Sequence, residues 1–138
     1  MKLDPSIYQE LINNIEIETV NLKDLTVKRA NYNNDQKNIE ISVKHGICSY
    51  QRVGDIFSVE IKFNIEGVTE EEKVLSIEFI LELIYEIDSS YAFEEDYFEL
   101  FTTNNVPVNA WPYARELVSN LTLRMGLAAL VLPVLKVK

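Results

Sequence analysis

The sequence opens with a helical pattern and then changes to alternation with a period of two. Asp4-Pro5 combines an N-cap residue with a proline at the first helical position, and apolar residues then recur three and four positions apart as far as Ile15. Over residues 15–27 apolar and polar residues alternate, but the face on which the apolar ones lie reverses twice. An extra residue in a strand reverses which face its side chains occupy. We therefore predict a short helix followed by a strand with bulges or a kink.

Three more segments alternate in the same way and predict further strands. They are residues 39–47, 53–66 and 74–87, and the polar residues 31–38 before them predict a loop. In the last segment acidic residues also recur every four positions, as in a helix, but the odd-numbered positions are apolar without exception, which favours a strand. Short connections favour antiparallel pairing, because a parallel pair needs a crossover. We therefore predict a four-stranded antiparallel meander.

The last third of the chain carries a different pattern. Residues 88–106 mix aromatic and acidic side chains without a period, which predicts an irregular crossover. Trp111-Pro112 predicts a helix start, because the residue before a proline avoids the helical conformation and proline fits the first turn. Gly126 ends that helix, and an apolar, then basic, tail follows over 127–138. The predicted fold class is α+β, with a four-stranded antiparallel sheet and a long C-terminal helix packed on it. Residues 1–138 have the length of a single domain.

The predicted sheet is too large for its predicted helical cover. Four strands of about 40 Å at about 4.8 Å spacing present a face on the order of 800 Å². A helix over residues 112–125 covers about 210 Å² of that face, since it is about 21 Å long and about 10 Å wide. Large uncovered apolar surfaces mark interaction sites. We therefore expect a homo-oligomer that assembles through sheet and helix, with an apolar groove left for another partner.

Composition narrows the partners and the compartment. The chain has 13 Lys and Arg against 22 Asp and Glu, a net charge of -9, which argues against nucleic acids and anionic membranes, since both attract cations. The one cysteine, Cys48, excludes an internal disulfide and fits a reducing compartment. The longest apolar run, residues 127–135, is too short to span a bilayer and contains Pro133. We expect a cytoplasmic protein that binds no nucleic acid and does not insert into membranes.

Motifs for catalysis or metal binding are not found in the sequence. His45 and Cys48 are three positions apart, so in a strand they face opposite sides, and no further ligands are spaced nearby. The same pair lacks the third, orienting group of a nucleophilic site. The four glycines are isolated, so no loop cradles a phosphate. We expect no cofactor, no metal and no enzymatic activity.

One motif resembles a known family. The run Val108-Asn109-Ala110-Trp111-Pro112-Tyr113-Ala114-Arg115-Glu116-Leu117-Val118-Ser119 is similar to the helix entry of the SecB family of export chaperones, in which a proline-tyrosine-alanine-arginine-glutamate sequence opens the long helix. The proline-containing aliphatic segment 127–133 and the stretch 21–27 also look like parts of that family. The resemblance implies a cytosolic, acidic chaperone that assembles as a homotetramer, a dimer of dimers. It also implies that unfolded polypeptides bind in hydrophobic grooves and that secretory precursors pass to the translocase motor SecA.

The resemblance places a client-binding groove between sheet, crossover and helix. Aromatic side chains suit such a groove because they offer apolar area at little entropic cost. The alternative is that the same rings belong to the chain's own core, with Trp111 anchoring the helix to the sheet. The expected groove residues are Tyr91, Phe93, Tyr97, Phe98, Phe101, Trp111, Leu127 and Leu130.

The family's acidic docking surface for SecA matches this chain at two positions. These are Asp24 and Glu78, while Lys28 stands where the family has an acid near the end of its first strand. The alternative is that both acids are ordinary solvated strand positions.

Three protein-binding functions remain open from the sequence, beside that of a monomeric small-molecule binder in the cleft between sheet and helix. The first is an ATP-independent holdase for unfolded polypeptides or preproteins. The second is a SecB-like chaperone dedicated to the antitoxin of a toxin–antitoxin module. The third is an adaptor or structural subunit whose apolar face is covered by one folded partner.

Overall fold

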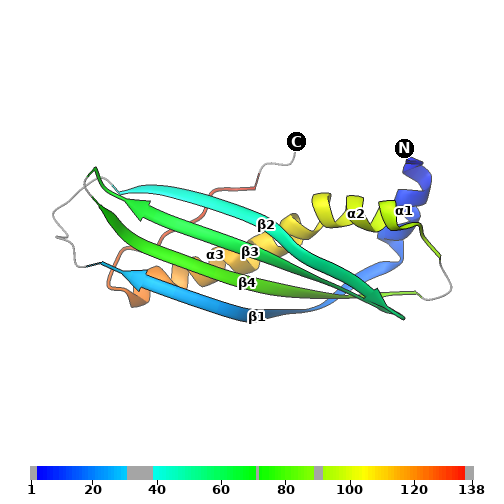
Figure 1. The fold of residues 1–138 in the computed structure, drawn as a ribbon, viewed down its shortest axis with the longest axis horizontal. Coiled ribbons are helices and arrows are strands. Elements are labelled where there is room, and N and C mark those ends of the chain that lie inside the picture. The colour runs from blue at the N-terminus through cyan, green and yellow to red at the C-terminus, as the bar shows by residue number, and fades with distance from the viewer. Residues whose placement is uncertain (1–2, 31–38, 71, 89–91, 136–138) are drawn as a thin grey trace.

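The computed structural model describes residues 3–30, 39–70, 72–88 and 92–135 (Figure 1). The first helix begins as predicted, because the Asp4 carboxylate accepts a hydrogen bond from the backbone N–H of Ser6 at 2.9 Å and Pro5 occupies the first turn. In chain order the elements are helix α1 (Pro5–Asn13), strands β1 (Ile15–Arg29), β2 (Glu40–Val53), β3 (Ile56–Val68) and β4 (Lys73–Ile87), and helices α2 (Glu95–Asn104) and α3 (Val106–Arg124).

The four strands form one antiparallel sheet in the order β1-β4-β3-β2. The predicted bulges in β1 are confirmed, since its register against β4 shifts between Ile17 and Thr19 and between Leu22 and Asp24. The predicted meander is wrong for β1, which pairs with β4 instead of β2. Residues 30–39 connect β1 to β2 and can extend over about 33 Å, whereas three strand spacings require only about 14 Å. The connection is therefore long enough for β1 to reach β4, whose apolar face it extends.

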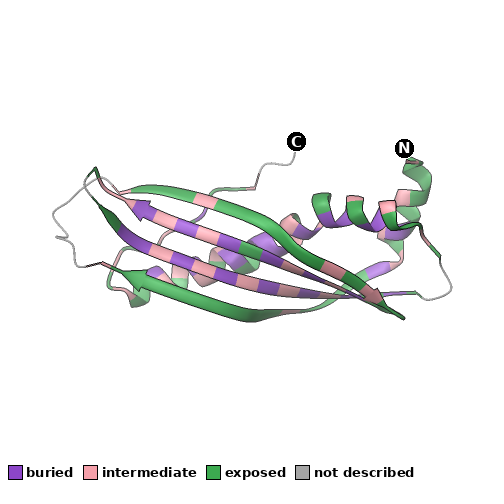
Figure 2. Ribbon diagram, viewed as in Figure 1, coloured by how far each residue is buried: buried purple, intermediate pink, exposed green. Residues whose placement is uncertain are grey.

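The core lies between the two central strands and the helices. α3 contacts β3 and β4, and α2 contacts β2, so the helices lie on one face of the sheet (Figure 1). Along β3 and β4 every second residue is buried beneath them, whereas β1 and β2 are exposed along most of their length (Figure 2). The buried inward residues of the central strands are Phe57, Val59, Ile61, Phe63, Ile65, Leu75, Ile77, Phe79, Leu81, Leu83, Tyr85 and Ile87.

The helical part differs from its prediction in two ways. The expected irregular crossover contains α2, and the long helix begins at Val106, so Pro112 lies inside it. Val106 and Ala110 are completely buried, and this burial extends the helix beyond the local signal at Trp111-Pro112. The Pro112 ring is exposed, and an interior proline removes one backbone hydrogen bond without ending this helix. Within the described ranges, no helix is long and apolar enough to cross a membrane.

The turn between β2 and β3 also corrects the prediction. Val53 was expected in the third strand, but it ends β2 and is exposed. Gly54 and Asp55 form the connection, and Gly54 has a φ of 62°, a left-handed conformation that glycine adopts without steric cost. β2 also has a register shift between Ile47 and Ser49, which reverses its alternation before the turn.

Candidate functional site

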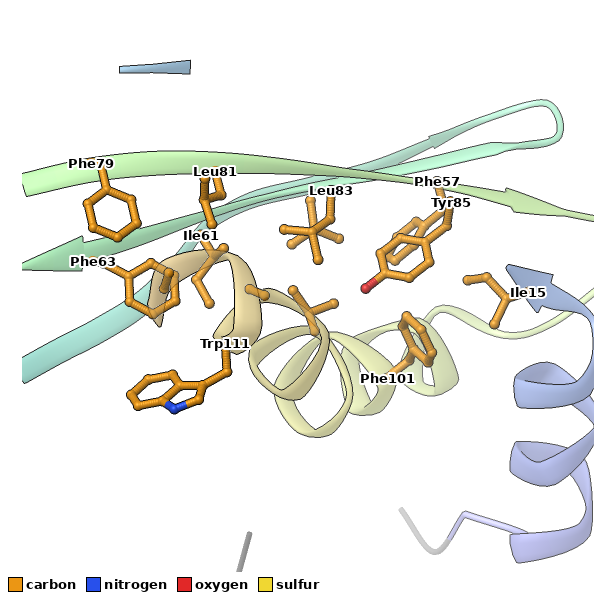
Figure 3. Packing of buried hydrophobic residues seen from close by; sticks show 14 of the residues in the cluster. Ile15, Phe57, Ile61, Phe63, Phe79, Leu81, Leu83, Tyr85, Phe101 and Trp111 are labelled. Atoms are coloured by element: carbon orange, nitrogen blue, oxygen red, sulfur yellow. The ribbon is translucent and has the colours of Figure 1, made fainter. Parts of the chain in front are cut away.

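The aromatic side chains of α2 lie mainly in the core. Tyr97, Phe98 and Phe101 are buried, and the Phe98 ring centroid lies 5.1 Å from that of Phe57 in β3. The Phe101 ring meets that of Tyr85 in β4 edge-on, with ring centroids 5.2 Å apart. Both rings are labelled in the close view of the core (Figure 3). The alternative stated for these rings, that they belong to the chain's own core, therefore describes most of their surface. Tyr91 lies outside the described residues.

An open hollow lies where this aromatic cluster meets the end of β2. It has a volume of about 240 Å³. The Phe93 ring, half-buried at its edge, meets Phe98 at 6.2 Å, and the guanidinium carbon of Arg52 lies 5.3 Å from the Phe98 centroid. A cation above an aromatic face is attracted by the ring quadrupole. We call this site the aromatic hollow, and its lining residues are Tyr50, Gln51, Arg52, Phe57, Phe93, Glu95 and Phe98.

The rim of the aromatic hollow is acidic. Glu95 and Asp96 lie in the first turn of α2, and Glu99 follows one turn later. Burial raises the pKa of Tyr50, and the charges of Glu95, Glu99 and Asp96 raise it further. The hollow therefore combines an apolar, aromatic interior with charges of both signs, the Arg52 guanidinium and the carboxylates of α2.

The two edge strands carry apolar residues that the helices do not cover. Cross-strand partners in a sheet share a face, so Leu22 opposite Leu81 and Ile41 opposite Gly67 face the helical side. Leu22 is nevertheless 48% exposed and Ile41 is 37% exposed. We call these surfaces the β1 strip (Ile17, Val20, Leu22, Leu25 and Val27) and the β2 strip (Ile41, Val43 and Ile47).

Trp111 joins α3, the sheet and the tail. It is buried, and its ring centroid lies 5.9 Å from Phe63 and 5.7 Å from His45 of β2. Its indole N–H donates a hydrogen bond to the carbonyl of Pro133 at 2.7 Å. These contacts agree with the anchoring role of Trp111, and its role in a client-binding groove stays a prediction. Leu127 and Leu130 in the tail are partly buried against the same core.

Comparison with known proteins identifies the family of the chain. The family model described as "Preprotein translocase subunit SecB" matches residues 8–136. The chain belongs to the SecB family. SecB proteins are chaperones and not enzymes, so the predicted absence of catalysis agrees with the family.

A solved structure agrees with the SecB fold. The Mycobacterium tuberculosis Rv1957 SecB-like chaperone, in complex with a ChAD peptide from the Rv1956 HigA1 antitoxin, has a TM-score of 0.84 and 16% identity, over 94% of this chain and 97% of that one. A protein of unknown function from Streptococcus agalactiae has a TM-score of 0.44 and 11% identity, over 87% of this chain and 97% of that one. No curated protein sequence matches significantly.

The two acids predicted to dock SecA lie on the outer face of the sheet. Glu78 lies opposite Thr26, and Asp24 lies opposite Ile80, so the two acids are neighbours on β4 and β1. The Glu78 carboxylate forms an ion pair with the Lys62 ammonium at 2.8 Å, and this contact raises the pKa of Lys62. The surface around these two SecB-type positions is therefore of mixed charge.

A stronger concentration of acids lies at the other end of the outer face. The nearby Glu18 carboxyl group is the main cause of a raised pKa of Glu86, with smaller contributions from burial, Asp55 and Glu16. Sequence reasoning missed this group, because Glu18 is the extra residue of a bulge and Glu86 lies on β4, far away in sequence. The described residues contain no group of three or more His, Cys, Asp or Glu that could hold a metal.

Proposed function

We propose that this SecB-family chain is an ATP-independent holdase that binds unfolded polypeptide along the β2 strip and in the aromatic hollow. The observation that carries the proposal is the incomplete cover of the sheet. Ile41 and Ile47 face the helical side but remain exposed, and the aromatic hollow opens beside the same strand. A strand that faced only water at these positions would carry polar residues there. The apolar residues therefore fit a partner that is apolar and extended.

Two physical terms would drive the binding of such a client. Burial of about 1,000 Å² of apolar client surface at about 25 cal/mol per Å² gives roughly 25 kcal/mol before costs. Ordering a disordered segment offsets most of this gain, which leaves an affinity between micromolar and nanomolar. The chain's net charge of -9 and the acids of α2 would speed encounter with basic segments. We therefore expect clients with apolar or aromatic residues flanked by Lys or Arg.

The proposed assembly is a homotetramer, a dimer of dimers, in the cytoplasm. The β1 strip supports it, because five apolar residues there face the helical side of an edge strand. The exposed apolar residues Val108, Tyr113 and Leu123 of α3 offer a second surface for assembly. Light scattering of the purified protein measures this directly, and a monomer at micromolar concentration would contradict it.

A chaperone dedicated to one antitoxin is the second candidate. The similar Rv1957 structure contains a peptide from an antitoxin, which supports a client of this class. The two candidates differ in client range. A dedicated chaperone would bind one antitoxin peptide far more tightly than a panel of unfolded proteins, and a general holdase would bind the panel with similar affinities.

Delivery of preproteins to SecA is a separate part of the proposal. Asp24 and the Glu78–Lys62 pair are the positions available for it on the outer face. Binding of purified SecA to the wild-type chain and to Asp24→Lys tests this part. Equal binding, or no binding to either protein, would contradict a docking role of Asp24.

The holdase proposal is tested by the aggregation of a reduced, unfolded client diluted from denaturant. We expect near-stoichiometric amounts of the protein to suppress light scattering without nucleotide. Ile47→Thr should weaken suppression because Ile47 lies in the β2 strip, whereas Val53→Thr is a matched control on the same strand that faces the outer side. Unchanged client aggregation with the wild-type protein would contradict the general holdase and favour the dedicated chaperone or a capped adaptor.

A further inference from the structure

The tail after α3 is hydrogen-bonded to Trp111, whose ring contacts His45 of β2. Residues 127–135 turn back at the end of α3, beginning with Gly126 at a φ of 79° (Figure 1). Leu130 is tied to Thr122 and Pro133 to Trp111, so the tail runs antiparallel to the helix. We propose that residues 130–133 occupy a client subsite, built from Trp111, Thr122 and the buried position of Leu132, that takes an aliphatic side chain of an extended peptide. This inference rests on the proposed holdase function.

The hydrogen bonds of the tail use its main chain and none of its side chains. The Leu130 backbone N–H donates to Thr122 Oγ1 at 2.9 Å. The Pro133 carbonyl accepts from Trp111 Nε1 at 2.7 Å. Every extended peptide carries the same backbone acceptor, and every residue but proline carries the donor. The two helical side chains can therefore bind a foreign peptide in the same way.

Only one side chain of this segment is fully enclosed. Leu132 is 1% exposed, whereas Val131 is 63% exposed and Val134 is 74% exposed. The central strands differ, because every inward position of β3 from Phe57 to Ile65 is buried. One anchor combined with main-chain hydrogen bonds is sufficient to recognise an aliphatic residue in many different sequences.

The position of the subsite connects it to the β2 strip. The Trp111 ring meets His45 edge-on, and His45 lies opposite Phe63, between Ile41 and Ile47 on the inward side of β2. A client lying along β2 would therefore reach the surface that Leu132 covers. The composition of the tail also matches the expected client. Eight of the nine residues 127–135 are Leu, Val or Ala, the ninth is Pro133, and the sequence continues with Lys136 and Lys138.

The first experiment uses the unmodified protein and hydrogen exchange. The probe is a reduced, alkylated unfolded protein that the chain has been shown to bind. We expect saturation with this client to remove exchange protection from the Leu130 amide, because the client replaces the tail at Thr122. Trp111 is the only tryptophan, so its emission should change in the same titration. Full protection of the tail with client bound would overturn the subsite while leaving the holdase function intact.

The second experiment weakens the tail. Leu132→Asn places an amide at the enclosed position, and Val134→Asn is a matched control at an exposed position. The probe is a fluorescein-labelled peptide with the sequence of residues 127–138. We expect Leu132→Asn to bind it at least ten-fold more tightly than the wild type or Val134→Asn, and to bind the unfolded client more tightly as well. Equal affinities in all three proteins would overturn the subsite, and no client binding to any of them would overturn the proposed function itself. If Leu132→Asn does not fold, the hydrogen-exchange experiment on the unmodified protein tests the subsite by itself.

Discussion

Phe98→Ala separates the structural role of the aromatic cluster from its proposed role in binding. Phe98 is 5% exposed, its ring packs on Phe57 and Phe93, and Arg52 lies over its face. Loss of a buried phenylalanine costs about 3–5 kcal/mol, and the adjoining hollow lets water fill part of the space. We expect a loss of about 3 kcal/mol in the free energy of unfolding, which lowers Tm by roughly 9 °C for a chain of this size.

The assay is urea unfolding followed by circular dichroism and by Trp111 emission, at one protomer concentration for all variants, since assembly affects apparent stability. Phe93→Ala is the matched variant, because Phe93 lies half-exposed at the mouth of the same hollow. We expect it to cost under about 1 kcal/mol in stability but to weaken client binding. A loss below about 1 kcal/mol for Phe98→Ala would refute the assignment of this ring to the core.

Three further changes test other parts of the structure. Gly67→Ala should cost about 1 kcal/mol in urea unfolding, because its Cβ would lie 2.9 Å from the Leu75 Cγ, and equal or higher stability would contradict this crowding. Tyr8→Phe should also cost about 1 kcal/mol in the same assay, since it removes the hydroxyl bond from α1 to the junction of α2 and α3, and an unchanged midpoint would contradict that role. Glu18→Gln removes the carboxyl group that raises the pKa of Glu86. In the wild type the raised pKa means that Glu86 takes up a proton at a higher pH in the folded state than in the unfolded state. The folded protein therefore gains stability as the pH falls through the folded pKa of Glu86 toward 4.5. The variant should therefore be the more stable protein at pH 7 and lose this advantage on acidification, and a constant difference across that range would contradict the carboxyl pair.

Local sequence patterns predicted the helices and strands well where the structure depends on residues close together in sequence. Both bulges of β1 follow from two reversals of its apolar face, and the N-cap at Asp4 follows from the dipeptide Asp4-Pro5. The pairing of strands that are distant in sequence could not be predicted from such local patterns. β1 pairs with β4 so that Ile15 lies opposite Ile87, and the sequence around β1 contains no pattern that indicates β4 as its neighbour. The start of α3 was misplaced because burial of Val106 outweighs the proline signal six residues later.

In the candidate site, too, the residue types could be predicted from the sequence, but their long-range contacts could not. Its aromatic residues were selected by type, and the structure then assigned most of their surface to the core. Tyr50 and Arg52 of the hollow were missed because they lie on β2, far in sequence from α2. A signal was available for them, since the bulge between Ile47 and Ser49 turns Tyr50 and Arg52 toward the helical side. That signal is visible only when the register against β3 is known.

The distribution of apolar residues across the sheet supports different partners for its two edges. On the outer face the inner strands carry ion pairs such as Lys62–Glu78 and Lys73–Glu66, as expected for a face in water. On the helical side the edge strands instead carry exposed apolar residues, with Leu22 on β1 and Ile41 on β2. In this structure the aromatic hollow and the tail subsite lie on the β2 side, since Tyr50 and Arg52 line the first and His45 contacts Trp111 at the second. The β1 strip has neither feature. This asymmetry supports assembly through the β1 edge and client binding along the β2 edge, so a change in one strip should leave the function of the other intact.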